Sequence, residues 1–193
     1  DCVVTMTSTG VTADLANNIV SLPEMDGRPA SNTYTHAYII ITNTFGLRGS
    51  VSIQNGSGDE VKYCSGTNGD STAGTTAASG FCTAQDHTET LDDFGDGSFS
   101  AYFAPATMDG GGKVSALLTA ADANLTTATN AGEVERLIGV FETNSGTPVV
   151  INNSTNGLEM QLTVTDIGYG IQFVNGEPYN FGSMPFKPVF ATF

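Results

Sequence analysis

The sequence contains no tryptophan and few charged residues. Charged residues make up 13% of its 193 residues and hydrophobic residues 39%. Disordered chains combine low hydrophobicity with high charge, so we expect this chain to fold. The lack of tryptophan counts modestly against a carbohydrate module, because sugar rings stack on aromatic faces. No hydrophobic run reaches the length of a membrane-spanning helix, so we expect no membrane insertion.

Basic residues are scarce as well. Six Lys and Arg against twenty Asp and Glu give a formal net charge of −14 at pH 7. Nucleic acids and anionic membranes are bound through basic patches, so we expect neither as a partner. Solubility is the simplest explanation of the acidic excess, with cation binding or a salty habitat as alternatives.

There are only three cysteines, and they favour an oxidising compartment. Because the chain starts at Asp1 rather than Met, we expect removal of a signal peptide and an extracellular location. Cys64 and Cys82 flank a low-complexity loop at residues 65–80, and a disulfide between them would add about 3 kcal/mol. Two unrelated buried thiols are the alternative. Cys2 is then left over beside the terminus, where a disulfide to a second chain is sterically easy.

The apolar residues gather in short segments separated by turn signals. Residues 34–54, YTHAYIIITNTFGLRGSVSIQ, predict a strand, a turn at 43–49 and a second strand at 50–54. The first strand is apolar on both faces, which predicts a central strand covered from both sides. Residues 1–7 predict either an edge strand of the chain's own fold or a strand exchanged with a neighbouring subunit. Residues 119–135 have room for one or two helical turns.

These segments predict an all-β fold. Strands do not alternate with long helices, so we expect one β-sandwich over residues 1–193, immunoglobulin-like or jelly-roll-like, with long loops. The strands of residues 34–54 resemble those of many bacterial immunoglobulin-like domains. No functional residue is carried over from that resemblance.

Groups typical of catalysis are few. His36 falls within a predicted strand, and His87 stands between Asp86 and Glu89 in what we expect to be an exposed loop. No G-x-S-x-G motif anchors a catalytic serine. A secreted hydrolase therefore has the least support, and we expect that the protein is not an enzyme.

Residues 92–97, DDFGDG, resemble a calcium-binding loop only superficially. Phe94 occupies the second ligand position and Phe103 that of the bidentate Glu, so the EF-hand pattern fails. Asp92, Asp93 and Asp96 remain candidates for an irregular calcium site. A solvated acidic turn is the simpler interpretation. No other cofactor is expected.

Two functional hypotheses follow. The first is a secreted structural subunit that assembles with itself into a filament, a pilus-like fibre or a surface layer, partly by β-strand addition. The alternative is a secreted binding module for a glycan or a surface protein, with calcium as its one candidate cofactor. The alternative for both terminal segments is that they pack on the core of their own chain and do not contact a neighbour. The predicted assembly contacts are Val3, Val4, Met6, Phe186, Phe190 and Phe193, with Cys2 as the intermolecular thiol.

Overall fold

The computed structural model describes residues 3–7, 27–54, 60–66, 71–73, 82–107, 112–143, 148–163, 169–174, 177–183 and 187–193. Strands dominate this part of the chain. The one helical element within it is a single 3-10 turn, η1 (Ala131–Glu133). The all-β prediction and the prediction of very short helical turns in this region are confirmed.

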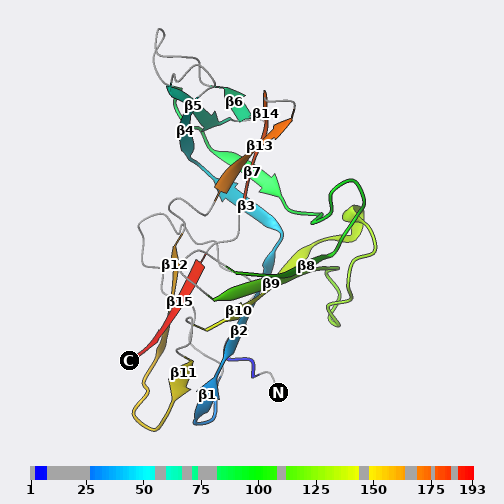
Figure 1. Ribbon diagram of the computed structural model, residues 1–193. Coiled ribbons are helices and arrows are strands. Elements are labelled where there is room, and N and C mark those ends of the chain that lie inside the picture. Colours follow the sequence, from blue (N-terminus) through cyan, green and yellow to red (C-terminus); the bar gives the residue numbers. More distant parts are fainter. Residues whose placement is uncertain are drawn as a thin grey trace.

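The largest sheet has four antiparallel strands in the order β2-β10-β9-β8 (Figure 1). These strands are β2 (His36–Thr42), β10 (Arg136–Glu142), β9 (Lys113–Thr119) and β8 (Tyr102–Thr107). Three small sheets pair β1 (Asn32–Tyr34) with β11 (Val149–Ile151), β12 (Leu158–Thr163) with β15 (Lys187–Thr192), and β13 (Tyr169–Val174) with β14 (Glu177–Ser183). The other described strands pair β3 (Thr44–Leu47) with β7 (His87–Thr90), and join β4 (Ser50–Gln54), β5 (Glu60–Ser65) and β6 (Ser71–Ala73).

The described strands thus form six sheets of two to four strands. A sandwich of two large sheets remains a prediction.

The prediction that residues 34–54 form two strands folded back on each other through a turn at 43–49 is wrong. β2, β3 and β4 follow one another along the length of the molecule, coloured from blue to cyan (Figure 1). β2 pairs with β10, β3 with β7 and β4 with β5. Residues 44–47, which we predicted as part of a turn, are themselves a strand. The stretch therefore organises the fold by contributing one strand to each of three sheets.

The core lies on one face of the four-stranded sheet. On this face Phe141 pairs with Val114 near one end, and Leu137 pairs with Leu118 near the other. Two buried clusters surround these pairs, and burying each large apolar side chain contributes roughly 1.5–3 kcal/mol. The first consists of Val114, Phe141, Val149, Ile151 and Phe190, and the second of Ala101, Leu118, Ala128 and Val134.

β2 is an edge strand of this sheet rather than the predicted central strand. Ala37 and Ile39 pack against the first buried cluster. On the opposite face Ile40 is 40% exposed. Only one of the two apolar faces of β2 is therefore covered by the core.

Candidate functional site

Residues 3–7 belong to no strand within the single chain. Val3 and Val4 are 44% and 58% exposed, whereas Met6 is partly buried. The chain's own sheets thus include no strand from this segment, and its exchange with a neighbour remains a prediction. Cys2 lies outside the described residues.

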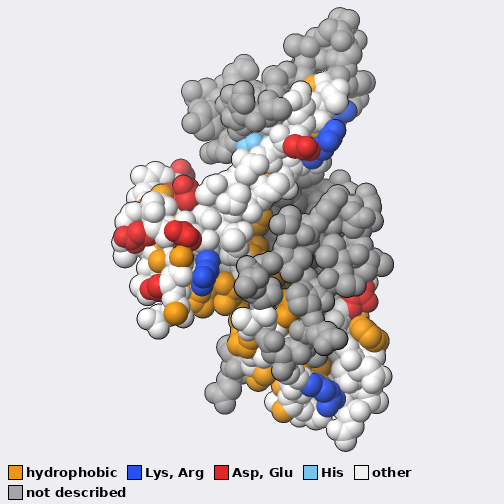
Figure 2. All heavy atoms as spheres, turned by 180° about the vertical axis from the view of Figure 1, so that it is seen from behind, with side chains coloured by type: hydrophobic (Ala, Val, Ile, Leu, Met, Phe, Trp, Pro, Cys, Tyr) orange, Lys and Arg blue, Asp and Glu red, His pale blue; other side chains and the backbone are white. Residues whose placement is uncertain are grey.

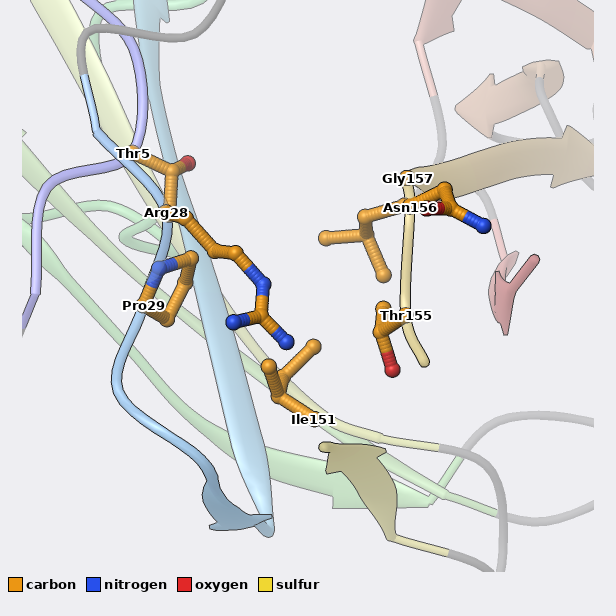
Figure 3. A pocket seen from close by; sticks show the side chains of 8 residues that line it. Thr5, Arg28, Pro29, Ile151, Thr155, Asn156 and Gly157 are labelled. Carbon is orange, nitrogen blue, oxygen red and sulfur yellow. The ribbon is translucent and has the colours of Figure 1, made fainter. Parts of the chain in front are cut away.

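A small pocket lies where this segment meets the rest of the chain. Thr5 and Pro29 line one side, Thr155 and Gly157 line the opposite side, and Ile151 lies between them at the bottom of the view (Figure 3). The Arg28 guanidinium, which also lines the pocket, donates a hydrogen bond to the Asn152 carbonyl. The pocket's volume of ≈ 30 Å³ is about that of one water molecule. It is a packing seam and not a site for an organic ligand.

The two edges of the four-stranded sheet differ in how well they are protected. β8 carries Pro105 in its strand, and its register shifts between Phe103 and Ala106, so pairing along that edge is interrupted. Proline and bulges are the devices by which edge strands avoid pairing with other chains. β2 has no proline, no lysine and no shift in its register with β10. Among the described strands, β2 pairs with β10 alone, so no described strand occupies its outer edge.

The C-terminal aromatic residues differ from one another. Phe190 is 5% exposed and packs in the core of its own chain, which is the alternative to an assembly contact at this position. Phe193 is 69% exposed. Its main chain exchanges hydrogen bonds with Gly157 in both directions, at 3.0 and 3.2 Å. Phe193 remains a candidate contact, and Phe186 lies outside the described residues.

The acidic turn at residues 92–97 is organised by one carboxylate. Asp93 Oδ1 accepts hydrogen bonds from the backbone N–H of Ser100 at 2.8 Å and of Gly95 at 2.7 Å. These two bonds lower the pKa of Asp93 below its ordinary value. Asp92 and Asp96 are exposed.

Within the part of the chain that the structure describes, no three His, Cys, Asp or Glu side chains gather around a common point. The arrangement of Asp93 is that of a turn held by its own carboxylate, since this oxygen is already occupied by two N–H donors. The described residues therefore provide no cluster of carboxylates that would support the predicted calcium site.

The two histidines lie in different environments. His36 is exposed at the start of β2, and its Nδ1 lies 2.9 Å from Thr35 Oγ1. His87 is 5% exposed and pairs with Leu47 at the start of β7, so the expectation of an exposed loop residue is wrong. His87 Nε2 has no hydrogen-bond partner among the described residues.

The predicted disulfide is present. Cys64 and Cys82 are bonded, with their Cα atoms 6.0 Å apart. The segment between them is not entirely loop, because β6 lies within it and pairs with β5. Next to Cys64, the buried Ser65 hydroxyl accepts from the Gly49 N–H at 3.1 Å and donates to the Gln85 carbonyl at 2.6 Å. The disulfide and Ser65 together join β4, β5 and the segment that leads to β7.

Sequence analysis did not identify Asn43 as a structural residue. It is 6% exposed and stands between β2 and β3. Its side-chain Nδ2 donates hydrogen bonds to the main-chain carbonyls of Leu91 and Val134, each at 3.2 Å. The main-chain carbonyl of Asn43 accepts a hydrogen bond from the Leu91 N–H at 2.8 Å. Asn43 was assigned to a turn because Asn is common there.

Comparisons with protein-family models, with curated proteins and with solved structures give no match for this chain. Within the described residues, no helix has the length and hydrophobicity needed to cross a membrane. A bonded Cys64–Cys82 pair is compatible with an extracellular protein.

Proposed function

We propose that this protein is a secreted, non-catalytic structural subunit that assembles with itself into an extracellular filament, pilus-like fibre or surface layer. One observation carries the proposal. Within the described part of the chain, the outer edge of β2 pairs with no strand, and the N-terminal segment, residues 3–7, is not itself part of a strand. An open edge and a segment able to extend along it are the two halves of a strand-addition contact.

In this proposal the N-terminal residues of one subunit add to β2 of the next. Main-chain hydrogen bonds along the edge supply affinity, and alternate side chains such as Val4 and Met6 supply specificity. Val3 and Val4 are exposed in the single chain, so pairing would remove apolar surface from water. Donor and acceptor are different surfaces, and a head-to-tail contact of this kind builds a filament unless it closes into a ring.

The other features are compatible with this role. The chain has a low charged fraction of 13%, which suits subunits that pack against neighbours. In the proposal Cys2 is close enough to the donor segment to form a disulfide with a neighbouring subunit. Phe193, exposed at the opposite terminus, is a further candidate contact.

Electron microscopy of the purified protein, with non-reducing gels alongside, tests the proposal. We expect regular filaments or sheets, and a ladder of bands that disappears on reduction. Val4→Asp places a charge in the donor segment and should abolish assembly while leaving a folded monomer. Val150→Asp is the matched control, because Val150 is also exposed, at 47%, but lies on β11.

Two results would contradict strand addition. One is assembly by a chain that lacks residues 1–7. The other is equal loss of assembly in the Val4→Asp and Val150→Asp variants, since that would indicate a general effect of added charge. A wild-type protein that stays monomeric at high concentration would favour the alternative, a secreted module that binds a glycan or a surface protein.

A further inference from the structure

The outer face of the four-stranded sheet is apolar in the middle and charged at both rims. The register places Ile40, Ile138 and Leu117 side by side across β2, β10 and β9, with Tyr102 of β8 next to Leu117. The neighbouring row consists of Tyr38, Val140 and Ser115. Ile40 and Tyr102 are 40% and 55% exposed, and the others are partly buried.

Charged residues border these two rows on opposite sides. Arg136 precedes them on β10 and Glu142 follows them. Lys113, on β9, lies 4.0 Å from Glu142. An apolar centre with a polar rim is the usual anatomy of a protein–protein interface. The space-filling view shows hydrophobic side chains reaching the surface over the middle of the molecule, beside a basic side chain (Figure 2).

Within the part of the chain that the structure describes, the guanidinium of Arg136 is not matched by an acidic side chain. Arg136 is partly buried, and among the residues that the structure describes its guanidinium has no ion pair or hydrogen bond. The side chain of Glu142 is 40% exposed, and its carboxylate lies 4.0 Å from the Lys113 ammonium, at the limit of an ion pair. β10 thus presents an unpaired cation at its start and an accessible anion at its end, with Ile138 and Val140 between them.

That pattern is complementary to itself, and we infer that this face binds the same face of a second copy of the chain. In this dimer the four-stranded sheets of the two copies face each other. The two-fold axis lies between them, runs perpendicular to the strands and passes the level of Gly139. It therefore stacks β10 on the second copy's β10, with the two strands running in opposite directions. Arg136 then lies over the second copy's Glu142 and Ile138 over its Val140, and both relations occur twice. A glycan or an unrelated protein would not need a face with this internal symmetry.

The contact explains why β2 is apolar on both faces. One face covers the core, and the other is covered by the second copy. It uses the outer face of the sheet, whereas strand addition uses the outer edge of β2, so both contacts fit one subunit. The inference extends the proposed self-assembly but does not depend on strand addition.

A charge exchange tests the contact. Arg136→Glu places two acidic residues opposite one another at both rims, and Glu142→Arg places two basic residues there. We expect each variant alone to weaken the dimer at least roughly tenfold, because like charges that face each other oppose binding. Mixing the two variants, or combining them in one chain, restores opposite charges and should restore the dimer.

The measurement is the solution mass by sedimentation equilibrium, at concentrations below those that give filaments. The wild-type mass should rise from 20.0 kDa towards twice that value as the concentration increases. Arg48→Glu is the control, because it makes the same change in net charge at an exposed position away from this face. That variant should dimerise like the wild type.

Three results would overturn the inference: a wild-type protein that stays at 20.0 kDa at its highest soluble concentration, a dimer that neither charge reversal weakens, and single variants whose mixture does not associate. Failure of filament formation with a dimer that follows the charge exchange would reject strand addition and leave this contact standing.

Discussion

The side-chain amide of Asn43 donates a hydrogen bond to the carbonyl of Val134, 91 residues further along the chain. The same amide bonds the carbonyl of Leu91, so one buried side chain connects the β2–β3 junction to the segments beside β7 and β10. Amides and carbonyls in such a place must pair with one another, because water does not reach them.

Replacing Asn43 should therefore destabilise the protein. Asn43→Ala leaves two carbonyls without this donor, and we expect a loss of about 1–3 kcal/mol in the free energy of unfolding. Urea denaturation measures it. Asn124→Ala, at an exposed position, should change stability by no more than about 0.5 kcal/mol. Equal effects of the two substitutions would contradict the role assigned to Asn43.

The two described C-terminal phenylalanines should differ in their contributions to stability. Phe190→Ala opens a cavity in the core and should cost about 3–5 kcal/mol. Phe193→Ala removes a ring that is 69% exposed, and we expect a loss near 0.5 kcal/mol for the monomer. Thermal unfolding of the two variants measures the difference. A monomer destabilised as strongly by Phe193→Ala would show that this ring packs on its own chain.

The two glycines of the acidic turn, Gly95 and Gly97, should respond differently to substitution by alanine. A methyl group on Gly95 would collide with the carbonyl oxygen of Ser98, so Gly95→Ala must displace backbone and should cost about 1–3 kcal/mol. Gly97 has a φ of +82° with open space around it, so Gly97→Ala strains only its own backbone, at about 1–2 kcal/mol. We expect the Gly95 variant to have the lower denaturation midpoint. The reverse order would argue against this description of the turn.

The lowered pKa of Asp93 predicts a pH dependence of stability. A carboxyl whose folded pKa is below its unfolded value stabilises the fold above that unfolded value, near 3.9 for Asp. The contribution is lost as the pH falls through the folded pKa. Denaturation at a series of pH values should show the largest difference between wild type and Asp93→Asn at neutral pH, and a shrinking difference under acid conditions.

Asp92→Asn is the control for this experiment, because Asp92 is the exposed neighbour in the same turn. Asp122 and Glu133 also have lowered pKa values, from the hydrogen bonds of Thr126 and Thr129, but they titrate equally in all three proteins. A difference between wild type and Asp93→Asn that is constant with pH would show that the charge of Asp93 is not what stabilises the turn.

Several elements were predictable because their signals are local. The all-β class followed from short apolar segments separated by turn signals, and the brevity of η1 from the poor helix formers around it. The Cys64–Cys82 disulfide followed from the small number of cysteines and from the loop between them. The strand predicted for residues 1–7 stays a prediction, because residues 3–7 form no strand in the single chain.

The pairing of strands was not predictable in the same way. Alternation shows which residues of β2 share a face, but it does not show that β10 lies beside them. Thr42 of β2 pairs with Arg136 of β10, and these two residues are 94 positions apart in the sequence. Asn43 and Gly49 look like turn residues, and a neighbouring strand in the sequence is the commonest partner. The chain extends instead because these residues bond to Leu91, Val134 and Ser65.

By itself, the sequence determined the all-β class, the two-sided apolar character of β2 and the disulfide, since each depends on residue type and spacing along the chain. The tertiary structure alone decided which strands lie at the edges of the four-stranded sheet, which face of the sheet covers the core, and where Arg136 and Glu142 lie relative to the apolar rows. Those features depend on contacts between residues far apart in the chain, and such contacts exist only once the strands have paired.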